Sequence, residues 1–164
     1  MAKQLFGTDG VRGIPGEYPL DDRTIYAIGR VLGEHLRSAG ANAPVLLGMD
    51  TRESGMLIAS TIARGLSEAG TLPLFAGVIT TPGVACLVRE RALAAGVVVS
   101  ASHNPYHDNG IKLISASGMK FPDETEARLE RAILASREKA PARSAVGVAI
   151  QAERELDLAY LAFL

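Results

Sequence analysis

The chain has 164 residues, enough for one domain with a substantial buried core. Apolar residues make up 48% of it, charged residues 21%, and the formal net charge is −1. This balance, without any basic block, argues against a nucleic-acid or membrane-surface partner. No apolar run approaches the roughly 20 residues of a membrane span, and the N-terminus lacks the apolar core of a signal peptide.

The cysteine and lysine contents add two constraints. The single cysteine, Cys86, excludes an internal disulfide and is typical of a reducing compartment, so we expect a cytoplasmic protein. Arginine outnumbers lysine 13 to 4. Against that background Lys112 is notable, because it stands inside an apolar run.

The first predicted elements are an irregular segment, a helix and a strand. Residues 7–13 contain glycine at every third position and are expected to lack regular structure. A helix begins with Asp21 or Asp22 as its cap, repeats apolar residues every three or four positions, and stops at Gly40. A short apolar strand follows at residues 45–49.

A second helix, a strand and a third helix occupy the middle of the chain. Ser54 is the expected cap of the second helix and Gly70 its end. Residues 72–78 are predicted to form a strand. The third helix has Pro82 in its first turn and runs to about Leu93.

The remaining elements complete an alternating pattern. Residues 97–99 and 111–114 are predicted strands whose short connection favours antiparallel pairing. Pro122 opens a fourth helix, residues 140–147 are expected to be a loop, and residues 153–164 form a last helix. The fold class is therefore α/β, with a mixed, mostly parallel sheet sandwiched between helices.

The C-terminal segment predicts a continuation of the protein. Its final residues are apolar and carry no helix cap, so we expect residues 1–150 to form one domain and residues 151–164 to begin a helix that connects to a further domain. Leu156, Tyr160 and Phe163 are expected on one face of this helix. Its exposed apolar end also suggests association into a homo-oligomer.

The polar loop between the last two predicted strands contains several side chains that could take part in catalysis. Residues 100–110 read Ser-Ala-Ser-His-Asn-Pro-Tyr-His-Asp-Asn-Gly and include hydroxyls, two imidazoles and a carboxylate. Asn104-Pro105 and Asn109-Gly110 are expected to shape its turns. Because α/β sheets bind ligands at the carboxyl ends of their strands, we predict the active site here.

Two motifs resemble those of the α-D-phosphohexomutase superfamily. They are residues 6–13, Phe-Gly-Thr-Asp-Gly-Val-Arg-Gly, and residues 100–105, Ser-Ala-Ser-His-Asn-Pro. With Asp-Asn-Gly-Ile-Lys at residues 108–112, they are most similar to the bacterial phosphoglucosamine mutase branch. The resemblance implies that the chain is the first of four domains. The family's metal-binding Asp-Gly-Asp-Gly-Asp-Arg loop lies outside it, so we expect the isolated chain to be inactive.

The activity implied by this resemblance is a phosphoryl exchange on a sugar. The family branch interconverts glucosamine 6-phosphate and glucosamine 1-phosphate through a phosphoserine enzyme and a bisphosphate intermediate, for synthesis of UDP-N-acetylglucosamine and cell-wall precursors. The implied partner is a small-molecule hexosamine phosphate. The implied cofactors are Mg²⁺ and, as activator, glucosamine 1,6-bisphosphate.

The resemblance also assigns roles to matching residues. Ser102 would store the phosphoryl group and bind the metal through its phosphate. Arg12 would present a planar fork to phosphate oxygens. Lys112 would be the general acid/base for the sugar hydroxyl, an action favoured by burial beside Arg12. His103 is a further catalytic candidate. Phosphate and substrate would also contact Thr8, Asp9, Gly10, Asn104 and Arg52.

Each of these assignments has a structural alternative. Ser102 could cap a turn, and Lys112 could be a solvated residue of an edge strand. Arg12 could pair with Asp9 within one loop. His103 could brace the loop instead of touching phosphate.

Two further groups of residues leave alternatives open. Residues 50–54 follow another strand. Arg52 and Ser54 therefore either support the polar loop of residues 100–110, hereafter the serine loop, from behind or form a helix cap with a surface arginine. His107 and Asp108 are expected to be loop scaffold. With His103 they suggest a metal site, but the pattern lacks a dependable fourth ligand.

Other function classes are less well supported by the sequence. A serine hydrolase would carry Gly-x-Ser-x-Gly, which is absent. A nucleotide-binding module would carry Gly-x-Gly-x-x-Gly or a Walker-type sequence, and neither is present. A phosphomannomutase or phosphoglucomutase of the same superfamily remains an alternative. So does a non-catalytic domain that only binds sugar phosphate.

Overall fold

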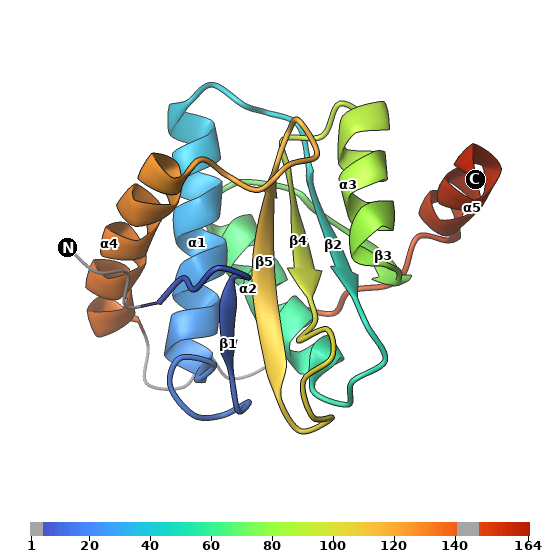
Figure 1. Cartoon of the computed structure of the whole chain (residues 1–164). Coiled ribbons are helices and arrows are strands. Elements are labelled where there is room, and N and C mark those ends of the chain that lie inside the picture. Colours follow the sequence, from blue (N-terminus) through green and yellow to red (C-terminus); the bar gives the residue numbers. More distant parts are fainter. Residues whose placement is uncertain (1–4, 141–147) are drawn as a thin grey trace.

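A five-stranded sheet in the order β1-β5-β4-β2-β3 forms the middle layer of the protein (Figure 1). The computed structural model describes residues 5–140 and 148–164. The strands are β1 (Val11–Gly13), β2 (Val45–Met49), β3 (Pro73–Val78), β4 (Ala95–Val99) and β5 (Asn109–Ser115).

Helices cover the sheet from both sides. One layer consists of α1, α2 and α4, with α1 packed against both of the others, and the opposite layer consists of α3 with α5 against it. The helices are α1 (Asp22–Ser38), α2 (Gly55–Glu68), α3 (Thr81–Glu90), α4 (Asp123–Lys139) and α5 (Arg154–Phe163).

The pairing of the strands confirms the predicted mixed sheet. Strand β2 runs parallel to β3 and β4, whereas β5 runs antiparallel to both β4 and β1. The short connection after β4 therefore reverses the chain, as its length required. One strand was not predicted: Val11–Gly13 lies in the glycine-rich segment that was expected to be irregular, and it forms by pairing with β5 at the sheet edge.

Alternation along the strands divides the core into two clusters. Leu47, Val97 and Ile111 face α1, α2 and α4, where they join the larger cluster. Leu46 and Val98 point to the other side and pack with α3. Because successive side chains of a strand point to opposite faces, continuous apolar runs are what a sheet covered on both sides requires.

Several helix ends follow the predicted signals. Asp21 caps α1, its carboxylate accepting a hydrogen bond from the Thr24 backbone N–H at 3.3 Å. The Thr80 hydroxyl caps α3 by accepting from the Gly83 N–H at 3.1 Å. Gly40 and Gly70 follow α1 and α2 with φ of 77° and 79°, the left-handed backbone that stops a helix at low cost.

Three local predictions were wrong. Helix α3 ends at Glu90, before the expected Leu93. Ser54 precedes α2 at the cap position, but its side chain makes no capping hydrogen bond. Asn109 and Gly110 begin strand β5 and do not form a turn.

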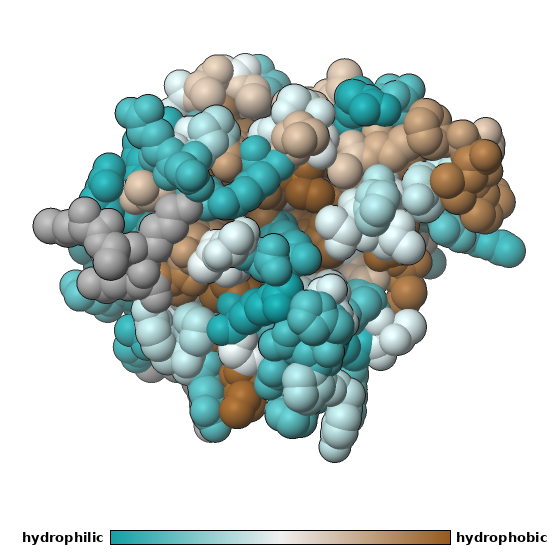
Figure 2. All heavy atoms as spheres, in the orientation of Figure 1, coloured by the Kyte–Doolittle hydropathy of each residue, from teal (hydrophilic) through white to brown (hydrophobic). Residues whose placement is uncertain are grey.

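The C-terminal helix exposes much of its apolar surface. Leu156 of α5 is buried and the Tyr160 hydroxyl lies 3.4 Å from the Thr80 hydroxyl, so this side packs on α3. Phe163, predicted on the same face, is 56% exposed. The exposed apolar atoms form the brown surface at the right of Figure 2. The helices of the described residues include none long and apolar enough to cross a membrane.

Gly65 allows α2 to approach α1 closely. A Cβ at Gly65 would lie 2.5 Å from the Tyr26 carbonyl oxygen and 2.6 Å from the Arg30 backbone nitrogen. Alanine is favoured over glycine inside helices by about 1 kcal/mol, but this contact is with backbone and cannot yield. We expect Gly65→Ala to lower the free energy of unfolding by about 1–3 kcal/mol in urea denaturation.

A matched control separates the clash from the change of residue type. The one close contact of a Cβ at Gly55 would be the flexible end of Met49, whose Sδ lies 3.0 Å away, and the next atoms lie at 3.6 and 3.7 Å. Gly55→Ala should therefore be close to neutral. Equal loss of stability in both variants would contradict the role assigned to Gly65.

His35 makes the stability of the fold depend on pH. Burial first, and the charge of Arg128 second, lower the pKa of His35 below its ordinary 6.5. The unfolded chain therefore binds this proton at a higher pH than the folded chain, and stability is lost as the pH falls below about 6.5. We expect the free energy of unfolding to fall less between about pH 7 and pH 5 in His35→Gln than in the wild type. An identical decrease in both would refute this origin.

Candidate functional site

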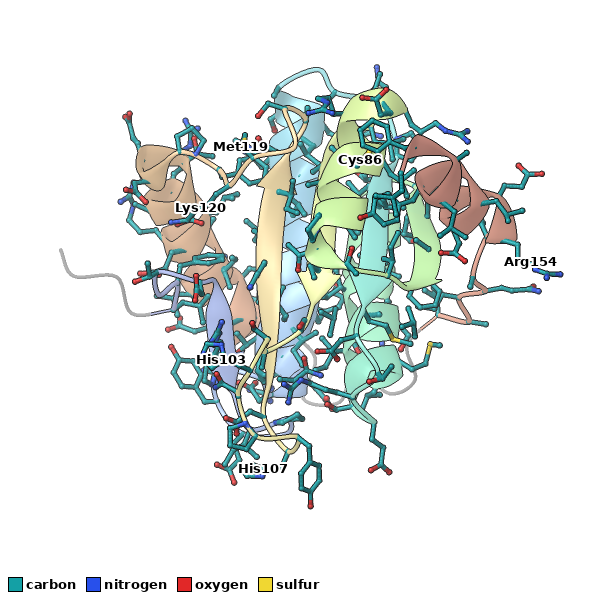
Figure 3. The ribbon with its side chains drawn as sticks, turned by 45° about the vertical axis from the view of Figure 1, so that its right-hand side comes forward. Cys86, His103, His107, Met119, Lys120 and Arg154 are labelled. Atoms are coloured by element: carbon teal, nitrogen blue, oxygen red, sulfur yellow. The ribbon has the colours of Figure 1, made fainter. Side chains whose placement is uncertain are left out.

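The loops that follow β2 and β4 meet at one edge of the sheet. Both strands point the same way, so residues 50–54 and residues 100–108 lie side by side at their carboxyl ends. Figure 3 places His103 and His107 at this end of the molecule, with Met119 toward the opposite end. This edge is where the sequence placed the active loop.

Arg52 joins these two loops. Its Nη1 donates to the carbonyls of Pro105 and Asp108 at 2.5 and 3.0 Å. Its Nη2 donates to the carbonyls of Ser102 and Asn104 at 3.0 and 2.9 Å. The fifth N–H, on Nε, is paired with the Asp50 carboxylate at 3.0 Å. All five donors of the guanidinium are thus directed at groups of the protein.

Ser102 occupies an unusual backbone conformation within this loop. Its φ is +56°, and its side chain is exposed. The Ser102 N–H donates to the Ser100 hydroxyl at 3.0 Å. A left-handed residue other than glycine is strained by about 1–3 kcal/mol, and such residues cluster at functional sites.

Arg12 reaches the serine loop from β1. Its Nη1 donates to the Asn104 side-chain oxygen at 2.8 Å, and its Nη2 lies 3.2 Å from the Asp9 carboxylate. Asn104 in turn donates to Asp108 at 3.1 Å. The Arg12 Nε is buried and has no hydrogen-bond partner in the described residues. The pairing with Asp9 that was the structural alternative therefore occurs, and Arg12 also reaches the serine loop.

The glycine-rich motif forms a tight turn against β5. The Gly7 N–H donates to the Gly10 carbonyl at 2.9 Å, leaving Thr8 and Asp9 exposed at the tip. Gly10 has a φ of +88°, and a Cβ there would lie 2.3 Å from the Ile111 carbonyl oxygen. Only glycine fits this approach.

A buried carboxylate of α4 anchors the start of this motif. Glu130 is 7% exposed, and its Oε2 accepts from the backbone N–H groups of Leu5 and Phe6 at 2.9 and 2.8 Å. The sequence analysis missed Glu130, because the acceptor lies more than a hundred residues from the groups that it binds.

Lys112 lies on the same face of the sheet as Arg12. Strand pairing sets Arg12 opposite Gly110, and Lys112 is two positions further along β5. Helix α3 borders this face of β5, because Ile114, two positions after Lys112, packs in the same cluster as α3 residues. Lys112 is half-buried and borders a pocket of about 350 Å³ whose lining includes Thr8, Asp9, Gly10, Thr81, Pro82, Leu113 and Glu126.

The two histidines of the loop are exposed. His107 lies 3.4 Å from the Asp108 carboxylate, with its ring edge-on to Tyr106. His103 makes no hydrogen bond or ion pair with another described residue. Among the residues that the structure describes, no three His, Cys, Asp or Glu side chains converge in a way that could hold a metal ion.

Asn109, which was predicted to shape a turn, instead connects the serine loop to α2. Its side chain is fully buried, and its amide nitrogen donates to the Ser54 hydroxyl at 2.9 Å. This contact explains why Ser54 does not cap its own helix. Asn109 therefore ties the end of the serine loop to the start of α2.

The fold and the site together define an α/β domain with a polar serine loop at the carboxyl ends of its strands. An exposed serine lies at the strand ends, where such sheets bind ligands, and an arginine reaches its loop. Residues 3–140 match the family of phosphoglucomutase/phosphomannomutase, alpha/beta/alpha domain I. The chain belongs to this family.

Individual relatives agree with the family assignment. A phosphoglucosamine mutase from Solibacter usitatus is 48% identical over all of this chain and 36% of its own length. A phosphoglucosamine mutase from Koribacter versatilis is 55% identical over 80% of the chain and 28% of its own length. A crystal structure of a phosphoglucomutase/phosphomannomutase family protein from Burkholderia thailandensis superposes with a TM-score of 0.72 at 26% identity, covering 84% of this chain and 31% of that one. The chain spans about a third of these relatives.

Removing the Asn109 amide should destabilise the site without touching any exposed group. Asn109→Ala leaves the Gly110 N–H, which donates to the Asn109 side-chain oxygen at 2.8 Å, without that buried acceptor. We expect the free energy of unfolding to fall by about 1–3 kcal/mol in denaturant titration. The exposed Asn42→Ala should change it by less than about 0.5 kcal/mol. A neutral Asn109→Ala would contradict this.

Proposed function

We propose that this chain is the phosphoserine-bearing first domain of a phosphoglucosamine mutase, which interconverts glucosamine 6-phosphate and glucosamine 1-phosphate. The observation that carries the proposal is the exposed, left-handed Ser102 on a loop bound to Arg12 through Asn104. Relatives named phosphoglucosamine mutase, at 48% and 55% identity, support the choice of sugar over glucose or mannose.

Ser102 would store the phosphoryl group between turnovers. In the first half-reaction the free hydroxyl of the sugar phosphate attacks the phosphorus of phosphoserine, and the bond between phosphorus and Ser102 Oγ breaks. The proton of the sugar hydroxyl leaves through a base and ends on Ser102 Oγ. The resulting bisphosphate then returns its other phosphoryl group to Ser102 by the reverse step.

Arg12 is the group best placed to bind the phosphate. Phosphoserine carries about −1.5 to −2 charges near neutral pH, so it needs a cation with free donors. Arg12 has one buried N–H without a partner and another on Asp9, which is 62% exposed. A dianion competes readily with an exposed carboxylate, whose ion pair contributes about 0–1 kcal/mol. Backbone groups of the Thr8–Gly10 turn border the same region.

Lys112 is the proposed general acid/base for the sugar hydroxyl. It lies on the face that holds Arg12 and borders the pocket described above. The pocket gives a sugar ring access to its amine. His103 is the second candidate, since its imidazole is exposed one residue from Ser102.

The proposed cofactor is Mg²⁺, with glucosamine 1,6-bisphosphate as the activator that first phosphorylates the enzyme. When bound, Mg²⁺ supplies positive charge to the phosphoryl oxygens. The described residues hold no cluster of metal ligands. The chain would offer the phosphate on Ser102, and the other ligands would come from further domains.

Intact-mass spectrometry of the chain after incubation with glucosamine 1,6-bisphosphate tests this function. We expect an adduct of about 80 Da, mapped to Ser102, because phosphorylation adds one phosphoryl group. Ser102→Ala should abolish the adduct, while the exposed Ser117→Ala should keep it. An unmodified wild type would support the non-catalytic alternative, and an adduct on another residue would overturn the site.

A further inference from the structure

Arg52 binds the serine loop from its inner side. The carbonyls of Ser102, Asn104, Pro105 and Asp108 converge on one guanidinium, each at 2.5 to 3.0 Å. These hydrogen bonds have a charged donor, which makes each of them roughly twice as strong as a neutral one. The loop therefore directs an unusual share of its carbonyl groups inward.

Peptide geometry fixes the direction of the neighbouring amides. In a planar trans peptide the C=O of one residue and the N–H of the next point in opposite directions. Since the Ser102 and Pro105 carbonyls face Arg52, the N–H groups of His103 and Tyr106 face away from it. Neither N–H donates a hydrogen bond to another described residue. Outward backbone N–H groups without a protein partner are available to an anion.

The same contacts hold Ser102 in its left-handed conformation. Its φ of +56° is strained, so it persists only where the surroundings determine it. Both backbone groups of Ser102 are held in place. Its N–H donates to the Ser100 hydroxyl, and its carbonyl accepts from Arg52. Turning φ to an ordinary negative value would move that carbonyl off the guanidinium.

Asp50 holds the Arg52 side chain in place. Asp50 accepts from the Arg52 side chain with one carboxylate oxygen and from the Arg52 backbone N–H with the other, both at 3.0 Å. The Arg52 side chain is only 10% exposed. A lysine could not replace it, because one ammonium group cannot reach four carbonyls in a planar arrangement.

We propose that Arg52 is a positioning residue that binds the carbonyl side of the serine loop, sets the left-handed backbone of Ser102 and turns the loop amides outward toward phosphate. It would act through Ser102 and would not touch substrate, in contrast to its predicted role in phosphate binding. The part of this inference that concerns phosphate binding rests on the proposed function, whereas the part that concerns the backbone conformation of Ser102 does not.

Solution NMR of the full 164-residue chain tests the conformation directly. A residue with positive φ gives a strong nuclear Overhauser effect between its own amide and α protons. We expect this signal at Ser102 in the wild type and its loss in Arg52→Gln and Arg52→Lys. Arg37→Gln is the matched control, since Arg37 also donates to a carbonyl, that of Gly70, at 2.8 Å. If Arg52→Gln does not fold, the Lys variant decides.

The rate at which glucosamine 1,6-bisphosphate labels Ser102 provides the second measurement. Misplacement by about 1 Å lowers reaction rates by about 100-fold, and we expect a loss of that order in both Arg52 variants but not in Arg37→Gln. An Arg52→Gln chain that keeps both the Ser102 signal and the labelling rate would overturn the inference. A wild type without labelling would refute phosphorylation of the isolated chain alone, because the NMR comparison would still decide the role of Arg52.

Discussion

The reversal of the chain between β4 and β5 is the constraint on which the site depends. Because these strands are antiparallel neighbours, residues 100–108 have to turn back within a short loop. Such a turn directs carbonyl groups into its own interior, where they need donors. Arg52 supplies them, and it can do so because β2 is the parallel neighbour of β4 and ends at the same edge. The conformation of this loop therefore depends on the order of the strands in the sheet.

The position of β5 brings the remaining site residues together. By pairing with β1 on its other side, β5 sets the Arg12 strand beside the serine loop and places Lys112 on the same face. Helices α1 and α4 cover one side of this part of the sheet (Figure 1), and on the other side α3 borders the pocket of Lys112. The larger apolar cluster stabilises the covered side. The other side carries Arg12 and Lys112.

Local signals predicted the helices well. The caps at Asp21 and Thr80 and the stops at Gly40 and Gly70 depend on residues within one turn of each other, so a short window of sequence contains them. Strand β1 escaped prediction for the opposite reason. Val11 favours a strand, but the segment is only three residues long and ends in glycine, and it extends by pairing with β5 about a hundred residues later.

The sequence by itself determined the element types, the α/β class and the two motifs that contain Ser102, Arg12 and Lys112. Only the tertiary structure decided how these residues are held. It gave Arg52 four carbonyls of a loop some fifty residues away, joined Arg12 to Asn104, and turned Ser54 from its helix toward Asn109. The physical reason is that a hydrogen bond between distant residues depends on strand order, which local conformational preference does not encode.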